Sequence, residues 1–205
     1  MPTHQFRQTL RPVLSVMGSQ HELPATAAMF NSSQKLVFSA GFYNVYNMTH
    51  ETEYGLYLPS FWAGFVASPN FSLFIQMASG SMQRETIAAF GPVLNFVWGE
   101  EAKETALNIA VNHLKGPKDF RTKDISMSVL KKTSLKKNIL IYGLSPHYIN
   151  AKIDLRDRNL KKSINETIFH IRLGMYRNIQ TLDLGFELDL SRETMITKLN
   201  MVMIL

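Results

Sequence analysis

Three carboxylates recur at alternate positions in "QTLDLGFELDL", residues 180–190. Alternate strand residues lie about 6.8 Å apart, so Glu187 and Asp189 approach the spacing of a glycosidase acid/base pair. The preceding segment "TIFHIRL" places Arg172 where it can pair across a strand ladder with Asp183 or Glu187. We favour this ordinary pairing over catalysis. It predicts that the acids form a solvated face and the leucines the core face of one strand.

Other catalytic or cofactor-binding patterns are missing from the sequence. The 6 histidines include no HExxH arrangement, and no GxSxG, GxGxxG or GxxxxGK[ST] motif occurs. The absence of cysteine excludes thiolate catalysis, cysteine-ligated metal centres and disulfides. The sequence therefore predicts no catalytic residue, no metal and no cofactor, and the chain is not predicted to be an enzyme.

Lysine pairs mark the ends of several predicted strands. More than half of the 22 Lys and Arg residues lie between positions 115 and 162, within a chain of net charge +6. Lysines at hairpin tips could contact phosphates. We favour solubility and the blocking of sheet edges, because no aromatic residues are interleaved with these lysines as a stacking platform would require. The candidate phosphate or acidic-partner contacts are Lys131, Lys132, Lys136, Lys137, Lys161 and Lys162.

Composition places the chain among folded proteins. It has 205 residues, of which 45% are hydrophobic and 19% charged. The first thirty residues lack the apolar core of a signal peptide. The longest uncharged apolar run, "GLYLPSFWAGFVA" at 55–67, is shorter than the roughly 20 residues that a spanning helix needs. The sequence therefore predicts neither a cleaved leader nor a membrane-spanning helix.

The elements expected to position these residues change along the chain. Residues 1–54 read as an N-terminal extension of uncertain order, 55–190 as the folded domain and 191–205 as a C-terminal tail. Three helices are predicted first, in "SPNFSLFIQMASGSMQRE", "RETIAAFGPVLNFVW" and "GEEAKETALNIAVNHLKGP". The last begins with acids and ends with lysine, which matches the helix dipole.

Period-two patterns follow the predicted helices. Strands are expected at 124–133, 137–145, 148–157, 164–173 and 179–190, with turns at 136–138, 145–147, 159–162 and 174–178. Helices followed by hairpin-linked strands predict an α+β fold, with an antiparallel sheet covered by helices on one side.

Several of these segments resemble the TraE-type conjugal transfer proteins of bacterial type IV secretion systems, which are relatives of the VirB-class bitopic proteins. The resemblance rests on "LPSFWAGFVASPNFSLFIQMA", on "ETIAAFGPVLNFVWGEEAKETALNIAVNHLKGPKDFRT", on "NILIYGLS" and on "ETIFHIRLGMYRNIQTLDLGFEL". It implies a nuclear-transport-factor-like or cystatin-like α+β roll with four or five strands. It also implies a scaffold that self-associates, contacts other secretion proteins and lies at the periplasmic face of the inner membrane. The chain departs from that family where it lacks an N-terminal span.

The resulting hypothesis is a non-enzymatic assembly component of a conjugation or secretion apparatus. Its candidate protein-contact residues lie in the "LPSFWAGF" segment, the first predicted helix and the last strand: Phe61, Trp62, Phe65, Phe71, Phe74, Asp183, Glu187 and Asp189. One alternative is a nucleic-acid-binding protein that uses the lysine-tipped hairpins. Another is an enzyme with a pocket in the roll, built on His170, Asp183 or Glu187. A cytoplasmic location is the alternative to the periplasmic one, and membrane association stays open.

Overall fold

The described part of the chain is built from β-strands. The computed structural model describes residue 14 and residues 36–47, 52–54, 59–82, 85–100, 103–116, 120–136, 138–155 and 160–205. Apart from the helical backbone of Leu14, every regular element in these ranges is a strand. The predicted α+β fold, with helices packed on one side of a curved sheet, is therefore wrong.

Eleven strands follow one another in the described residues. In chain order they are β1 (Leu36–Asn47), β2 (Thr52–Tyr54), β3 (Ser60–Ser68), β4 (Phe71–Met82), β5 (Glu85–Glu100), β6 (Lys103–Lys115), β7 (Arg121–Leu135), β8 (Asn138–Leu155), β9 (Leu160–Ile179), β10 (Leu182–Leu190) and β11 (Thr194–Ile204).

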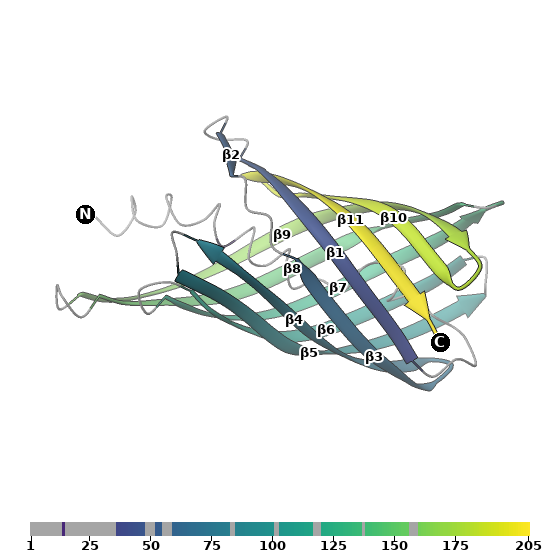
Figure 1. The fold of residues 1–205 in the computed structure, drawn as a ribbon, viewed down its shortest axis with the longest axis horizontal. Helices are drawn as coiled ribbons and strands as arrows, with labels where there is room; N and C mark the ends of the chain where they lie inside the picture. Colours follow the sequence, from purple (N-terminus) through teal and green to yellow (C-terminus); the bar gives the residue numbers. More distant parts are fainter. Residues whose placement is uncertain are drawn as a thin grey trace.

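The strands close into a ring. Neighbours in the order β11-β10-β9-β8-β7-β6-β5-β4-β3-β1 pair antiparallel, and β1 also pairs with β11, from Val37 opposite Ile204 to Asn47 opposite Thr194. The three-residue β2 pairs only with the end of β1. The eleven described strands less β2 therefore form a ten-stranded, closed antiparallel barrel (Figure 1).

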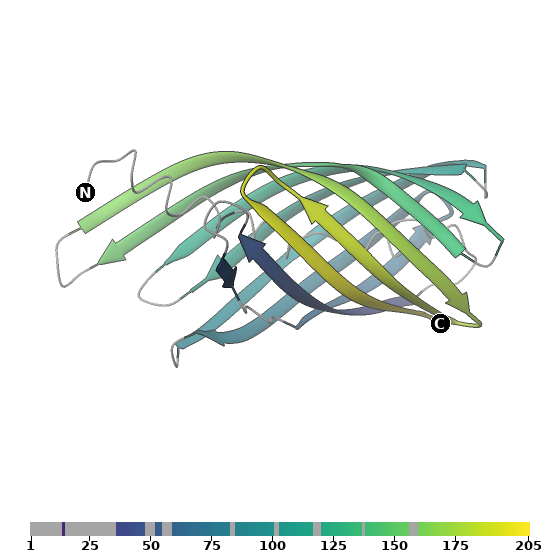
Figure 2. The ribbon, with the colours of Figure 1, turned by 90° about the horizontal axis from the view of Figure 1, so that it is seen from above.

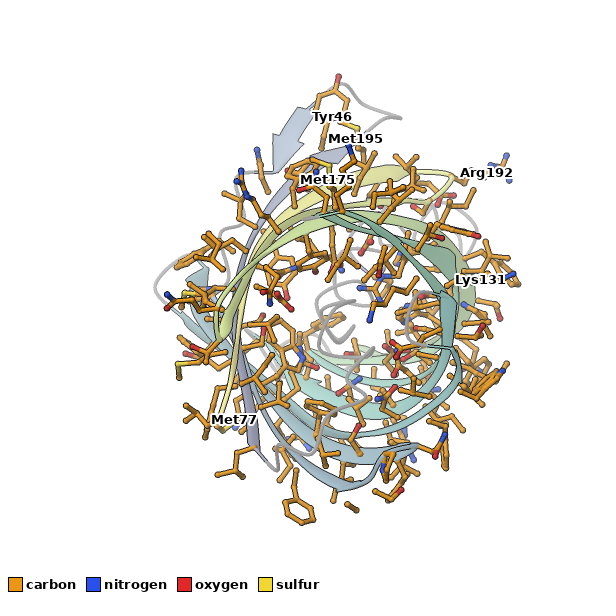
Figure 3. All side chains as sticks on the ribbon, turned by 90° about the vertical axis from the view of Figure 1, so that its right-hand side faces the viewer. Tyr46, Met77, Lys131, Met175, Arg192 and Met195 are labelled. Carbon is orange, nitrogen blue, oxygen red and sulfur yellow. The ribbon has the colours of Figure 1, made fainter. Side chains whose placement is uncertain are left out.

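Side chains alternate between the outside and the inside of this barrel. In β4, Leu73, Ile75 and Met77 point outward and are 41%, 56% and 58% exposed, whereas the alternate residues Ser72, Phe74 and Gln76 are buried. Figure 3, a view along the barrel, shows side chains on both sides of the ring, with Met77 on the outer side. The outward parity is apolar, and the inward parity mixes polar and charged residues with apolar ones. A water-soluble sheet protein usually has the apolar parity inside and the polar parity outside.

Outward apolar residues surround the barrel. We call the following set the outer belt: Phe42, Phe61, Ile75, Met77, Phe90, Met127, Leu144, Phe169, Phe186 and Leu199, all of them exposed. They come from every strand of the ring except β6. An apolar exterior of this extent indicates contact with something other than water.

The two ends of the barrel differ. At the C-terminal rim, where β1 begins and β11 ends, the described turn residues are 69–70, 136 and 180–181. Lys136 and Gln180 have positive φ angles of 55° and 60°, as tight hairpin turns require. We call the opposite end, where β6 and β8 end and β7 and β9 begin, the loop rim.

Strands β8 and β9 extend beyond their neighbours at the loop rim. They contain 18 and 20 residues, whereas about 9–11 residues suffice to cross a bilayer. β10 pairs only with the half of β9 from Ile171 to Ile179. The other half of β9 pairs with β8 and extends past the shorter strands, as Figure 2 shows.

The predicted helices are strands β4, β5 and β6. In "KETALNIAVNHLK" the acidic start and the final lysine suit a helix, but the outward Leu107 and Val111 alternate with the inward Asn108 and Asn112. The inward parity also contains apolar residues such as Ala110. Together with the outward apolar residues, they hide the period-two pattern in the sequence. Apolar residues on both parities imitate the 3.6-residue stripe of a helix.

The predicted strands fare better than the helices. Those at 124–133, 164–173 and 179–190 lie in β7, β9 and β10. Those at 137–145 and 148–157 are one strand, β8, so the turn predicted at 145–147 is wrong. The turn at Lys136 is confirmed, whereas β9 runs through 174–178 and turns at Gln180 instead.

The predicted domain boundaries divide the barrel. Strand β1 falls in the predicted extension and β11 in the predicted tail, yet the two pair with each other to close the ring. No helix among the described residues is long and apolar enough to cross a membrane.

Candidate functional site

The carboxylates of β10 point into the barrel. Asp183, Glu187 and Asp189 are 4%, 1% and 0% exposed, whereas Leu184 and Phe186 face outward at 42% and 44%. The alternation was predicted, but its sense is the reverse of the prediction that the acids face water and the leucines the core. The prediction assumed a water-soluble sheet, in which the apolar parity faces inward.

Four charged side chains form an ionic network inside the barrel: Arg172, Glu187, Asp189 and Lys198. Arg172 Nη2 donates to Glu187 Oε2 at 2.7 Å, and Arg172 Nε lies 3.4 Å from Asp189 Oδ1. The ammonium of Lys198 pairs with Asp189 Oδ2. The predicted pairing of Arg172 with Glu187 is confirmed, but it is buried rather than solvated. Such a network is stable only while every charge keeps its partner.

Aromatic side chains surround the ionic network. The Tyr176 hydroxyl donates to Glu187 Oε1, and Asn200 Nδ2 donates to the Tyr176 oxygen at 3.1 Å. Lys198 Nζ lies 5.5 Å from the centre of the Tyr43 ring. Tyr176 has room because Gly185 lies directly opposite, where a Cβ would overlap its ring. Small and large inward residues are thus matched across strands, as narrow barrels require.

Two further polar contacts lie on the inner surface. His147 Nδ1 is 3.0 Å from Asp124 Oδ2, and its ring centre is 5.0 Å from that of His170. Lys132 Nζ donates to Glu104 Oε2 at 2.9 Å. Within the described ranges, no group of three or more histidine or carboxylate side chains is placed to hold a metal ion.

A row of hydroxyls and amides crosses the wall formed by β4 to β8. Ser72 pairs in register with Asn95, Asn95 with Asn108, and Asn108 with Ser128. The Ser145 hydroxyl donates to the Ser128 hydroxyl at 2.8 Å, and Asn95 Nδ2 donates to Ser72 Oγ at 2.8 Å. We call these five residues the polar row. All are buried from the outer surface.

The middle of this wall keeps polar atoms without a protein partner. Both side-chain amide atoms of Asn108 and of Asn112, and the Thr122 hydroxyl, make no hydrogen bond to the described protein. Buried polar groups are satisfied in native proteins, either by protein or by ordered water. These groups therefore indicate that the lumen beside β6 and β7 holds water.

An apolar cluster lies inside the barrel toward the loop rim. Leu14, the one described residue before Leu36, is 0% exposed there. The cluster joins Leu14 with Ala78, Ala89, Leu114, Ile149, Ala151 and Ile168. A second apolar cluster, which includes Trp62, Phe74 and Tyr176, also lies inside the ring. The described lumen wall is therefore mixed, with polar and charged side chains beside apolar ones.

The C-terminal rim opens into a cavity. It has a volume of about 730 Å³ and is lined by Lys132, Ser134, Lys136, Asn138, Ile139, Arg177, Asn178 and Ile179. Asn178 Nδ2 donates to Asp183 Oδ1 at 2.8 Å at its edge. The cavity gives the lumen a polar mouth.

Acids outnumber bases among the described inward-facing charges. The acids are Glu104, Asp124, Asp183, Glu187 and Asp189, and the bases are Lys132, Arg172 and Lys198. Since the lumen has a lower dielectric constant than water, this excess favours a negative potential in the interior, away from the mouth where Lys136 and Arg177 lie.

The structure separates the predicted contact residues into two sets. Phe61 and Phe65 are 53% and 49% exposed on the outer surface, and Phe71 lies on the same side, 5.1 Å from Phe96 between ring centres. Trp62 and Phe74 point inward and are buried, as are the three acids.

The predicted phosphate contacts are likewise scattered. Lys131 faces outward, Lys132 faces inward and Lys136 occupies a turn. Lys137 lies outside the described residues. Only the backbone of Lys161 and Lys162 is described, in β9. The structure does not bring these lysines together.

Sequence reasoning missed the residues that line the lumen. Asn95, Asn108, Asn112 and Lys198 were assigned no role, although the two asparagines of "ALNIAVNH" recur on one parity while Leu107, Ile109 and Val111 occupy the other. That recurrence was the available signal, because one polar parity beside one apolar parity is typical of a membrane barrel strand.

Comparisons with known proteins agree with the barrel fold. No protein-family model matches the chain, and no curated protein matches it in sequence. The translocator domain of the autotransporter NalP from Neisseria meningitidis is similar in structure, with a TM-score of 0.58 and 8% identity over 96% of this chain and 97% of that chain. An outer membrane channel from Pseudomonas putida F1 gives a TM-score of 0.55 and 9% identity over 90% and 100%. At these identities the likeness shows the fold alone.

This fold corrects the functional interpretation of the sequence. The resemblance to TraE-type proteins is wrong, because their α+β roll is not formed and the solved relatives in structure are barrels. The predicted role as a type IV secretion scaffold is therefore wrong. The predicted location, at the periplasmic face of the inner membrane or in the cytoplasm, is wrong as well. Neither the nucleic-acid-binding alternative nor the enzyme with a pocket in the roll is supported.

Proposed function

We propose that the chain is an outer membrane β-barrel that provides a narrow passage for small polar solutes, with a preference for cations. A barrel satisfies all its backbone hydrogen bonds between strands, which is one of the two ways in which a chain can span a bilayer. The outer belt supplies the apolar surface that lipid requires. The likeness of the fold to an outer membrane channel supports the same location.

The polar row is the observation that carries the proposal. It runs across β4 to β8 on the inner surface of the barrel. The amides of Asn108, within the row, and of Asn112, beside it, have no hydrogen-bond partner in the described protein. Groups that exchange hydrogen bonds with water can exchange them with a passing ion or solute. A sealed barrel would favour apolar or internally paired side chains at these positions.

Several features make the passage narrow. Barrels of about eight strands have interiors that side chains nearly fill, whereas barrels of about 16 strands contain open channels. The ring here has ten strands, which are the eleven described strands less β2. Its size is therefore closer to that of the eight-stranded barrels. The ionic network fills the side formed by β9 to β11. The route therefore follows the opposite wall, from the mouth lined by Lys136 and Asn178 past the polar row.

The excess of lumenal acids over bases predicts selectivity. A negative potential inside a low-dielectric wall concentrates cations and repels anions. We retain non-enzymatic action as part of the proposal, because the lumenal histidines and acids that the structure describes serve one another as partners.

Conductance in planar bilayers tests this function. The full chain, refolded and inserted, should give small, ohmic single-channel currents, and a KCl gradient should give a reversal potential toward that of K⁺. Protection of the strands from added protease, with cleavage confined to connections, establishes insertion independently. Insertion with no measurable conductance, or with anion selectivity, would contradict the proposal.

A second function is favoured by the apolar cluster around Leu14. Its members are buried inside the barrel, and Arg172 and Lys198 are almost fully buried as well. A barrel filled in this way could act as a membrane anchor whose loop rim makes the functional contacts. Inserted protein that never conducts is the outcome that this second function predicts.

A further inference from the structure

Three cations face outward in one row at the loop rim. Lys115 at the end of β6 pairs in register with Arg121 at the start of β7, and Arg121 pairs with Lys152 of β8. All three side chains are exposed. We call them the basic row. None of them belongs to the lumen described above, because their parity on each strand is the outward one.

The surroundings of the basic row are graded along the strands. One step toward the barrel centre, the outward row is polar and consists of His113, Lys123 and Asn150. The next outward residues, Ile125 and Tyr148, are 44% and 48% exposed and belong to the apolar surface. Phe90 packs against His113 with ring centres 5.7 Å apart. On the outer surface of these strands, the residues thus change from apolar to polar to cationic toward the loop rim.

Cations directly opposite one another destabilise a sheet. Cβ atoms of such cross-strand neighbours lie about 4.5–5.5 Å apart, and like charges there repel. No described carboxylate forms an ion pair with Lys115, Arg121 or Lys152. Three adjacent cations that pair with no carboxylate among the described residues favour an anion at this surface.

We propose that the basic row binds the phosphate headgroups of anionic lipids in the leaflet that surrounds the loop rim. This inference rests on the proposed membrane location. The position suits a lipid, because the cations project sideways from the wall just beyond the apolar surface, at the level where headgroups follow acyl chains. Arg121, in the middle, can bind a phosphate through two N–H groups, and its lysine neighbours add point charges.

A lipid explains the gradation better than a soluble anion does. A phosphate-bearing lipid would lay its acyl chains along Ile125 and Tyr148 while its headgroup meets the cations. His113, Lys123 and Asn150 lie between, at the level of the ester and hydroxyl groups of a headgroup. A soluble anion would use only the basic row and would gain nothing from the apolar surface beside it.

Lipid retention in nanodiscs tests the proposal on the full chain. The probe is phosphatidic acid, present as a minor component in phosphatidylcholine, and the readout is the lipid that stays bound in native mass spectrometry. The triple variant Lys115→Gln, Arg121→Gln, Lys152→Gln should lose roughly tenfold to a hundredfold in apparent affinity, since each cation near an anionic surface contributes to binding. A control with the same charge change, Lys131→Gln, Lys136→Gln, Arg177→Gln, should keep wild-type retention.

Other outcomes would overturn the inference. Equal loss in both triple variants would show a general charge effect, and equal retention would show that the basic row does not bind lipid. Inorganic phosphate that competes at the same concentration as phosphatidic acid would assign the site to free phosphate. Insertion is measured first, by protease protection in pure phosphatidylcholine. Failure at that step contradicts the proposed membrane barrel, whereas intact insertion without selective retention contradicts only the lipid site.

Discussion

The two sides of the lumen differ in how their inward-facing polar groups find partners. On the side of β9, β10 and β11, charged residues face inward and are paired within the ionic network. On the side of β4 to β8, hydroxyls and amides face inward, and Asn108 and Asn112 have no protein partner. The first side is held mainly by ion pairs between its own side chains. The second side is completed by water.

Because of this difference, we expect the ionic network to determine the stability of the fold and the polar row to determine conduction through the lumen. Buried charges tie β9 and β10 to β11, the strand that closes the ring against β1. Breaking them should cost stability and should alter conductance mainly through loss of folded protein. Changes in the polar row should alter what the lumen conducts while the fold persists, because neutral amides that already lack protein partners leave no buried charge behind.

The largest effect is expected from Arg172→Leu. Removing the guanidinium leaves Glu187 without its cation and Asp189 with Lys198 alone, and breaking a buried pair in this way costs about 3–5 kcal/mol. Urea unfolding from detergent micelles, followed by tryptophan fluorescence, measures the change. The exposed Arg177→Leu is the matched control and should shift stability little. A loss at Arg172 no larger than at Arg177 would show that the network is not a structural tie.

A smaller loss is expected from Gly185→Val. The new side chain would occupy the space of the Tyr176 ring, and overpacking of this kind costs typically about 1–3 kcal/mol. The same unfolding assay applies, with Leu184→Val on the outer surface as the control. An unchanged midpoint would mean that Tyr176 does not depend on the space beside Gly185.

Conductance should respond to Asn108→Leu. The apolar side chain removes the unpartnered amide from the middle of the polar row, and the single-channel current should fall about threefold as the passage dehydrates. Ser39→Val, on the opposite wall, should leave the current near wild type, because Ser39 Oγ already donates to the Met201 carbonyl. The reverse ranking of the two variants would place the route along the charged wall.

The smallest effect is expected on selectivity. Asn108→Asp adds one negative charge to the polar row and should raise the K⁺ over Cl⁻ permeability ratio about twofold. Reversal potentials under a KCl gradient measure the ratio, and the effect should shrink at high salt as the charge is screened. A shift toward anions would contradict the assigned route.

The alternation within single strands could be predicted from the sequence. Which parity faces inward, and how the strands close into a ring, could not. Strands β7, β9 and β10 follow the period-two runs, and the pairing of Arg172 with Glu187 followed from them. Whether Leu184 or Asp183 faces inward depends on the solvent around the barrel, which the pattern does not specify. The pairing of Val37 with Ile204 joins opposite ends of the chain, and no local signal specifies such a contact.

The missed strands share one physical cause. In β4 to β6 small or apolar residues such as Phe74, Ala78 and Ala110 stand among the inward polar ones. A lumen wall has to accommodate large neighbours and tight corners, so its composition is mixed. Mixed inward positions obscured the alternation and produced helical spacing by coincidence.

Labelling of single cysteines tests the central claim most directly, namely that the outward parity of each strand faces lipid and the inward parity faces a water-holding lumen. The chain has no cysteine, so Asn108→Cys and Met127→Cys each place one thiol, on the inner wall and on the outer belt respectively. In bilayers, a small, charged, water-soluble thiol reagent should modify Asn108→Cys and leave Met127→Cys unmodified, while both react after unfolding. Reaction at Met127→Cys with protection at Asn108→Cys would contradict the account.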